Sequence, residues 1–266
     1  MANLNFEELL NAGVHFGHLK RKWNPAMAPY IFDEKKGIHI IDLNKTIIKI
    51  EEAASAMKQI AKSGRKILFV ATKKQAKEIL ENKVAETRMP FISERWPGGM
   101  LTNFKTTRKT IRKMSSIDKM MKDGTADTMS KRERLQMTRQ REKMGKIFGC
   151  VVDMSRLPAA IFIVDIKKEH IALAEARNLG IPVFAMVDTN SNPSGVDFVI
   201  PSNDDATKSI DLVLTAMCDA VKDGLGERKA SKEKADADAQ KAKAAKQEAK
   251  EAAEVVSAEA DVKETK

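Results

Sequence analysis

Short unbroken apolar runs alternate with stretches of helical periodicity along most of the chain. The runs of strand length lie at residues 38–41, 67–71, 91–93, 160–164, 183–187 and 198–200. A run that is apolar at every position indicates a strand covered on both faces. Strands that alternate with helices through short connections predict an α/β fold with a parallel, doubly wound sheet.

The helices expected between these strands have recognisable ends. They are expected at residues 3–11, from an Asn44 cap to Gly64, from a Thr72 cap to about Arg88, at 167–179, and from Asp205 to about Lys222 with Gly224 as the stop. Capping side chains and terminal glycines are the usual signals for such ends. Residues 13–36 have no regular period, and we expect this aromatic segment to pack irregularly on the body.

Residues 103–148 interrupt the alternation with two helical stripes. The first stripe is Phe104, Thr107, Ile111, Met114, Ile117 and Met121, and the weaker second one is Leu135, Met137, Met144, Ile147 and Phe148. Between them, Asp123–Gly124 predicts a turn and Ser130–Glu133 a capping box. The pattern predicts an antiparallel coiled-coil hairpin inserted into an α/β body of residues 1–102 and 149–226.

The last forty residues differ in composition from the rest. Residues 227–266 carry ten basic and ten acidic side chains and almost no core formers. We expect this charged, low-complexity tail to be disordered, because it buries too little apolar surface to offset the entropy cost of folding.

The net charge of +10 lies almost entirely in the expected hairpin, which has 14 Lys and Arg against five Asp and Glu. A charge run is usually a solvated helix face, but the acids that would pair along this helix are nearly missing. Concentrated positive charge favours a polyphosphate backbone as the partner. The candidate RNA contacts on the hairpin are Lys105, Arg108, Lys109, Arg112, Lys113, Arg132 and Arg139.

Two further segments carry basic or glycine-rich patterns. The candidate RNA contacts of the first are Lys20, Arg21, Lys22 and Trp23. This segment suits backbone contact with base stacking, or equally an indole that anchors the loop to the body. Arg95 precedes residues 96–99, whose paired glycines could cradle a phosphate but lack a complete phosphate-binding motif. We favour a structural corner that starts the hairpin, with Arg95 as another candidate RNA contact.

Asp165 and Asp188 each directly follow an expected strand and so lie at the carboxyl edge of the sheet. Open α/β sheets bind ligands there, and paired carboxylates could hold Mg²⁺. No nearby residue completes a catalytic set by spacing, so we favour Asp165 as a cap of the next helix. His15 and His18 with Asp33 make a weak metal pattern, and we expect hydrogen-bonded loop histidines instead.

The remaining signals bound the class of protein. Cys150 and Cys218 form no paired motif, and we expect both to be buried and inert. The N-terminus is acidic where a signal peptide is basic, and no apolar run approaches the ~20 residues that span a bilayer. We therefore expect a cytoplasmic protein with no membrane partner, and no spacing of residues indicates a catalytic set or a metal site.

Several long segments, spread over about residues 1–225, resemble one known family and occur in the same order as in that family. They are Ala12–His18, Trp23–Pro25, Gly37–Leu43, Arg95–Asn103 and Ile181–Asp205. They are similar to the bacterial small-subunit ribosomal protein S-two family. The resemblance implies a flavodoxin-like domain with a protruding coiled-coil hairpin and a structural role on small-subunit ribosomal RNA. It also implies no catalytic residues, no small-molecule substrate, no metal and no cofactor. It also implies neighbouring small-subunit proteins as partners, in many bacteria including the messenger-binding protein S-one.

Two other classes of function stay open from the residues alone. One is a flavodoxin-like, Mg²⁺-dependent enzyme using Asp165 and Asp188, which tight nucleotide or flavin binding would support. The other is a protein-interaction module whose hairpin docks a helical partner, which salt-insensitive binding would favour.

Overall fold

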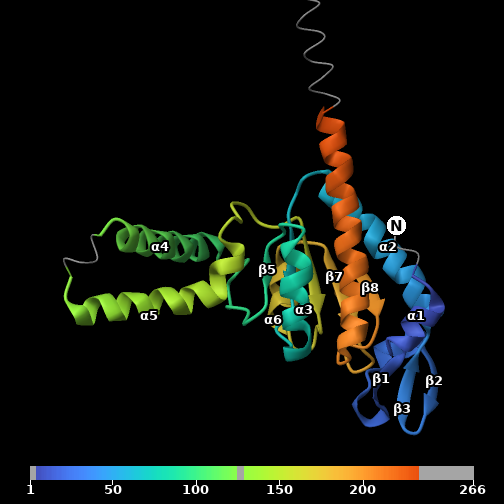
Figure 1. The fold of residues 1–266 in the computed structure, drawn as a ribbon. Helices are drawn as coiled ribbons and strands as arrows, with labels where there is room; N and C mark the ends of the chain where they lie inside the picture. The colour runs from blue at the N-terminus through green and yellow to red at the C-terminus, as the bar shows by residue number, and fades with distance from the viewer. Residues whose placement is uncertain (1–3, 125–128, 234–266) are drawn as a thin grey trace, which may run out of the picture.

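The computed structural model describes residues 4–124 and 129–233, and its centre is a five-stranded parallel sheet in the order β5-β4-β6-β7-β8 (Figure 1). The strands are β4 (Ile67–Val70), β5 (Phe91–Ile92), β6 (Ala160–Val164), β7 (Val183–Val187) and β8 (Phe198–Pro201). The central strands β4, β6 and β7 are buried at every position, as their unbroken apolar runs predict. The expected α/β fold with a parallel sheet is confirmed.

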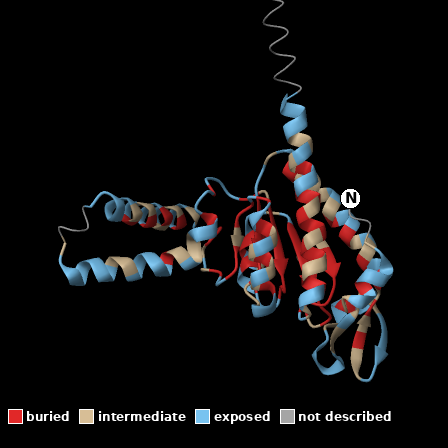
Figure 2. Cartoon of the chain, in the orientation of Figure 1, coloured by how far each residue is buried: buried red, intermediate tan, exposed pale blue. Residues whose placement is uncertain are grey.

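Helices cover both faces of this sheet, and Figure 2 shows the buried layer between them. The helices of the body are α1 (Phe6–Asn11), α2 (Leu43–Lys62), α3 (Lys74–Ala85), α6 (His170–Asn178) and a last helix over residues 207–233. The helices α2, α3 and the last one pack on the face that carries Phe69, Phe162 and Phe184. Helix α6 packs on the opposite face, beside Ile161 and Ile163.

Two helix starts differ from the expected ones. Asp42 accepts a hydrogen bond from the backbone N–H of Asn44 at 3.0 Å, so Asp42 caps α2 and the expected Asn44 cap is wrong. Helix α3 starts after Lys73 without a side-chain cap, and the Thr72 hydroxyl donates instead to Glu169 on the neighbouring loop. At α2 the carboxylate of Asp42 is a stronger acceptor than the expected Asn44 side chain. At α3 the carboxylate of Glu169 engages the hydroxyl of Thr72, the residue expected to cap that helix.

Residues 16–41 form a small antiparallel sheet rather than the irregular segment that the sequence predicts. Its strands, in the order β1-β3-β2, are β1 (Phe16–Leu19), β2 (Ile31–Lys35) and β3 (Ile38–Ile41). Two 3-10 turns, Lys20–Lys22 and Pro25–Tyr30, join β1 to β2. The strand expected at 38–41 therefore exists but belongs to this sheet. Its two neighbours are short and largely exposed, so they leave no apolar run in the sequence.

Helices α4 (Phe104–Lys122) and α5 (Lys131–Phe148) form a pair that projects from the side of the sheet (Figure 1). The expected capping box of Ser130 and Glu133 is confirmed. Four members of the first stripe are buried, namely Thr107, Ile111, Met114 and Ile117. Of the second stripe only Met144 is buried, and Leu135 is 51% exposed. The two helices share a small core of Met114, Ile117 and Met144, against which the half-buried Met137 and Phe148 also pack, and most other residues of α5 are exposed.

The last helix continues through Gly224 to residue 233, so the expected stop at Gly224 is wrong. A Cβ at Gly224 would lie 2.4 Å from the carbonyl oxygen of Lys58, so this glycine permits a close crossing with α2. Glu227 forms ion pairs with Lys58 at 2.7 Å and with Lys62 at 2.9 Å. The first residues of the expected tail are therefore helical, and residues 234–266 lie outside the described part of the chain.

Across the ranges that the structure describes, no helix combines the length and the apolar character needed to cross a membrane.

Candidate nucleic-acid interface

A buried carboxylate holds the corner from which the hairpin starts. Glu175, on α6, is 6% exposed and accepts a hydrogen bond from the indole Nε1 of Trp96 at 3.0 Å. It also accepts from the backbone N–H groups of Gly99, Leu101 and Thr102 at 2.7, 2.9 and 3.0 Å. Burial acts to raise the pKa of Glu175, but these hydrogen bonds outweigh it and lower that pKa. The protein's own carboxylate thus occupies the amides that could have cradled a phosphate, as expected of a structural corner.

The basic side chains of the hairpin are mostly exposed. The exposed candidates are Lys105, Lys109, Arg112 and Lys113 on α4, and Arg132 and Arg139 on α5. Within the described ranges, none of these six forms an ion pair with a carboxylate, whereas Arg141 bridges the helices by pairing with Asp118 at 2.7 Å. The hairpin therefore presents uncompensated positive charge to solvent, which is what a phosphate backbone requires.

Arg108 differs from its neighbours because it has a partner within the protein. Its guanidinium donates to the carbonyl oxygen of Ser155 at 2.7 Å and ties α4 to the segment that follows α5. A groove of about 410 Å³ lies beside this contact, with Arg112 and Lys119 on its rim and Ile111 in its wall. Such a groove can accept an anionic group between the two cations.

The basic residues before Trp23 lie at the other end of the molecule, in the turn after β1 (Figure 1). Lys20 pairs with Glu34 at 2.7 Å, which leaves it less available to a partner. The exposed cations of this turn are Arg21 and Lys22. The ring of Trp23 lies 5.1 Å from that of His39, centroid to centroid, and is 36% exposed. The indole thus anchors the turn to β3 and stays partly accessible, but this turn and the hairpin do not share one surface.

Arg95 is exposed at the corner after β5, close to the start of the hairpin. It lines a hollow of about 320 Å³ together with Lys168 and Glu169. Burial raises the pKa of Glu169, although hydrogen bonds from Thr72 partly oppose that shift. Arg95 is therefore placed beside the hairpin base, where it can extend the same basic surface.

The protein's own cation occupies the carboxyl edge of the sheet. Lys73, just after β4, places its Nζ 2.6 Å from Asp205, 2.8 Å from Asp204 and 3.5 Å from Asp165. Burial acts to lower the pKa of Lys73, but hydrogen bonds and charges from these carboxylates outweigh it and raise that pKa. Asp165 also accepts from the two backbone N–H groups that open the turn before α6, at 3.0 and 3.2 Å. Asp165 therefore caps this turn and not the helix, and the expected helix cap is wrong, because α6 begins at His170 with Glu169 at its N-cap and no side-chain cap.

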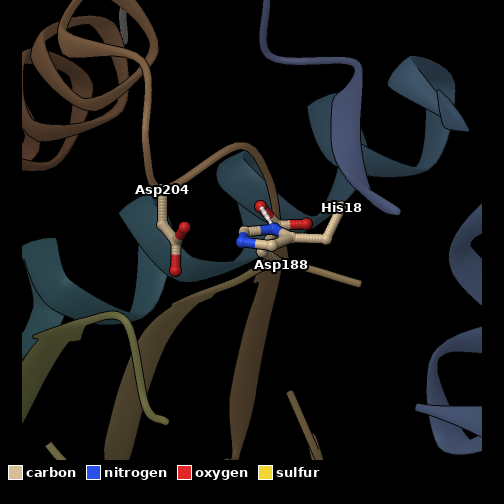
Figure 3. Close-up of side chains that lie close together, drawn as sticks. All are labelled: His18, Asp188 and Asp204. Atoms are coloured by element: carbon tan, nitrogen blue, oxygen red, sulfur yellow. Dashed lines mark hydrogen bonds and ion pairs between the residues drawn. The ribbon is translucent and has the colours of Figure 1, made fainter. Parts of the chain in front are cut away.

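A second group at this edge could hold a divalent cation. His18 Nδ1 lies 2.8 Å from Asp188, and Asp204 completes a set whose ligand atoms lie within 4.8 Å of one another (Figure 3). One imidazole and two carboxylates form a donor set that Zn²⁺ accepts. Oδ2 of Asp204 has no hydrogen-bond partner among the described residues, and burial raises the pKa of Asp204 to about 7, helped by the charges of Asp165 and Asp188.

Neither Asp204 nor Glu175 carries a signal in the sequence. Asp204 meets His18 across most of the chain, and Glu175 meets its donors across more than seventy residues, so no spacing motif links them. The hydrogen bond that the His18 ring donates to the Asp188 carboxylate raises the pKa of His18 despite burial, and the expectation of a hydrogen-bonded loop histidine is correct there. For His15 it is not confirmed, because its Nδ1 has no partner in the described ranges.

The two cysteines differ in exposure. Cys218 is buried, and burial raises the pKa of its thiol to about 12, as expected of an inert cysteine. Cys150 is exposed, so the expectation of burial is wrong for it. Its apolar neighbour Val151 points into the core, but Cys150 itself lies in the short 3-10 turn after α5, at the surface.

Known proteins match nearly the whole of this architecture. The family model described as Ribosomal protein S2 matches residues 9–224. The small ribosomal subunit protein uS2 of Parabacteroides distasonis is 65% identical over 237 residues, which cover 89% of this chain and 85% of that protein. The protein of the same name from Azobacteroides pseudotrichonymphae is 65% identical over 228 residues, covering 86% and 87%. Because the match spans body and hairpin alike, the chain belongs to the ribosomal protein S2 family, the S-two family that its motifs resemble.

Proposed function

We propose that this chain is a structural constituent of the small ribosomal subunit that binds ribosomal RNA through the α4–α5 hairpin. Its family and the relatives named small ribosomal subunit protein uS2 support the ribosomal role. The chain is not an enzyme, and its place is on the ribosome in the cytoplasm. The observation that carries the RNA contact is the row of exposed, unpaired cations on α4. Each one that neutralises a phosphate releases counterions, which makes binding favourable and salt-dependent.

The residues proposed to contact RNA fall into two groups. On and beside the hairpin they are Arg95, Lys105, Arg108, Lys109, Arg112, Lys113, Arg132 and Arg139, and in the N-terminal turn they are Lys20, Arg21, Lys22 and Trp23. Arg108 and Lys20 contribute less, because Ser155 and Glu34 already engage them. The contacts read the shape and the backbone of folded RNA, since its deep major groove admits few side chains.

The finer architecture belongs to the same proposal. Numbered along the chain, the five parallel strands lie in the order 2-1-3-4-5, which supports a flavodoxin-like body. The shared core of Met114, Ile117 and Met144 supports a short antiparallel coiled coil in the hairpin. Body, hairpin and tail accordingly correspond to residues 1–102 with 149–226, 103–148 and 227–266.

Neighbouring small-subunit proteins are the second class of partner that we propose. An apolar groove of about 440 Å³ between α1 and the small sheet is lined by Phe6, Phe16 and Phe32, and Phe32 is 75% exposed. Exposed apolar groups of this kind mark protein–protein contacts. The messenger-binding protein S-one is the candidate that the family resemblance supplies for this role. Phe32→Ala should reduce co-sedimentation of S-one with the subunit while leaving this chain in place.

Sedimentation through sucrose gradients tests the RNA contact. The full chain should co-migrate with the small subunit and leave it as the salt concentration rises. A variant with Lys109, Arg112 and Lys113 replaced by Gln should dissociate at lower salt. The matched control replaces three exposed cations of the body that have no carboxylate partner in the described ranges, namely Lys74, Lys167 and Lys208. Equal behaviour of the two variants would remove the hairpin as the anchor.

The two alternative classes give different results in the same experiment. Salt-insensitive association would favour a hairpin that docks a protein helix. Migration at the top of the gradient in every buffer would favour the enzyme hypothesis, which the family does not support. That hypothesis is also weakened by Lys73, because its ammonium group lies 3.5 Å from Asp165, one of the two carboxylates that would hold Mg²⁺.

A further inference from the structure

A second basic site lies at the amino-terminal edge of the sheet, where the last helix passes the end of α3. It is a pocket of about 480 Å³. Its cationic walls are Lys66, Arg88, Arg228, Lys229 and Lys232. Figure 1 shows that the last helix, whose residues form one wall of the pocket, rises beyond the sheet and away from the projecting hairpin. The sequence gives no sign of this pocket, because its cations come from three separate segments and two of those segments also contain acids.

Two acids of this region, Glu86 and Glu227, are neutralised by lysines that do not line the pocket. Glu86, the one carboxylate among the lining residues, pairs with Lys222 at 2.6 Å, and that ion pair lowers the pKa of Glu86. Glu227 pairs with Lys58 and Lys62, which lowers the pKa of Glu227 to about 2. Within the described ranges the five cations of the pocket have no carboxylate partner, so their charge is available to a ligand.

The last helix is fixed where it carries these cations. Glu227 binds the end of α2, and Gly224 allows the close crossing just before it. The guanidinium of Arg228 lies over Gly64, so close that a Cβ at Gly64 would lie 2.0 Å from the guanidinium carbon. On the opposite wall, Lys66 Nζ donates to the backbone carbonyl of Arg88 at 2.7 Å. Two walls of the pocket are thus held in place before any ligand arrives, which reduces the entropy cost of binding.

From this geometry we infer that the pocket binds consecutive phosphate groups of ribosomal RNA, as a contact distinct from the hairpin and from the N-terminal turn. This inference rests on the proposed function. The volume exceeds what one oxyanion fills, since a water molecule takes about 30 Å³ in the liquid. No aromatic ring is among the lining residues that the structure describes, so stacking of a base is not the basis of recognition. Clustered Lys and Arg around an open pocket suit the phosphates of a strand.

The two basic sites would then fix the orientation of the body on the RNA. The hairpin projects from the β5 side of the sheet, while the pocket lies at its amino-terminal edge. Together with the contacts proposed for the N-terminal turn, separated contacts at the hairpin and at the pocket restrict how the body can rotate on the RNA. Binding at one site also raises the effective concentration of RNA at the other, so that the two contacts strengthen each other.

The test uses the full chain and purified small-subunit ribosomal RNA, with affinity measured by filter binding over a salt series. The pocket variant replaces Arg88, Lys229 and Lys232, all exposed, by Gln and leaves Arg228 in its contact with Gly64. The control variant replaces Lys74, Lys167 and Lys208 by Gln and so removes the same net charge. With about 0.7–0.9 counterions released per phosphate, the slope of log affinity against log salt should fall by about 2–3 for the pocket variant only.

The outcomes separate this inference from the proposed function. If the pocket variant matches the control variant while the hairpin variant binds weakly, the pocket does not contact RNA and the hairpin proposal stands. If wild type shows no salt-dependent binding, and the hairpin variant binds no differently, the proposed function itself fails. Unchanged thermal denaturation of all variants confirms that folding is intact.

Lysine acetylation of the wild-type chain, read by mass spectrometry, locates the contact without mutation. Protection of Lys66, Lys229 and Lys232 by the RNA supports the inference. Protection by inorganic phosphate alone, or by vesicles containing an anionic phospholipid, without protection by RNA would overturn it and assign the pocket to another anion.

Discussion

The carboxylate of Glu175 should contribute more to stability than any single exposed charge. It accepts hydrogen bonds from four residues, Trp96, Gly99, Leu101 and Thr102, and the Glu175→Ala substitution removes all of these acceptors at once. Two donors, the indole N–H of Trp96 and the backbone N–H of Leu101, are buried, and an unsatisfied buried donor costs about 1–3 kcal/mol. The other donors reach water, so the free energy of unfolding should fall by about 2–6 kcal/mol.

Urea denaturation of the full chain, followed by tryptophan fluorescence, measures this loss. It is large against the total of about 5–15 kcal/mol that is typical of a folded domain. Trp96 reports on the corner directly, because its indole is one of the donors. Glu175→Gln should also destabilise, since its amide turns one acceptor into a donor that faces N–H groups. Glu78→Gln, at an exposed position of α3, is the matched control and should stay within about 0.5 kcal/mol of wild type.

The same carboxylate predicts a loss of stability in acid. The pKa of Glu175 in the folded chain lies below the ordinary value of 4.5, because hydrogen bonds to the charged form outweigh burial. Its contribution is therefore complete above the pKa of the unfolded chain and is lost as the pH falls through the lower pKa of the folded chain. Wild type should lose stability in that range more steeply than Glu175→Gln. If Glu175→Ala unfolds at the wild-type urea concentration, packing alone holds the corner and this reasoning is refuted.

Three further predictions concern other parts of the chain. Gly224→Ala should lower the free energy of unfolding by about 1–3 kcal/mol, because its Cβ would meet a backbone oxygen of α2. Gly226→Ala, with no atom within 4 Å of the added Cβ, should be neutral or stabilising. Equal shifts of the two variants in thermal denaturation would contradict the close crossing. Iodoacetamide should modify Cys150 in the native chain and leave Cys218 unmodified, as mass spectrometry would show; equal rates would contradict the burial of Cys218. Arg108→Gln should speed amide hydrogen exchange at the start of α4, since it removes the bond to Ser155, and unchanged exchange would argue that this bond does not restrain the hairpin.

The parallel sheet could be predicted from the sequence because burial on both faces leaves a pattern that exposed structure does not. Strands β4, β6 and β7 are buried throughout, and each appears in the sequence as an unbroken apolar run. Strand β2 is mostly exposed, so its residues 31–35 follow no such pattern. The end of the last helix is predicted wrongly for a related reason. A glycine such as Gly224 usually indicates a helix end, and only the close approach of α2 explains why it lies inside a helix here.

The candidate RNA contacts, too, could be predicted only in part from the sequence. The sequence shows which residues of the hairpin are cationic, and it correctly predicts a large excess of positive charge on α4. It does not show which cations are already paired. Arg108 with Ser155 and Lys20 with Glu34 are matched across loops, and spacing along the chain holds no information on such pairs. The pocket at the amino-terminal edge was hidden likewise, because the lysines that neutralise Glu86 and Glu227 are distant in sequence.

The location of the unpaired positive charge follows from the contacts at the carboxyl edge of the parallel sheet. In open α/β sheets that edge is the usual ligand site, and here three carboxylates surround Lys73 while His18 pairs with Asp188. These groups tie the N-terminal sheet and the loops after β4, β7 and β8 together, so the edge stabilises the body instead of opening to a substrate. Other cations are left available. Lys105, Lys109, Arg112 and Lys113 on α4, and Arg88, Lys229 and Lys232 of the amino-terminal pocket, have no carboxylate partner in the described ranges. A polyanion can therefore neutralise them without breaking an internal ion pair.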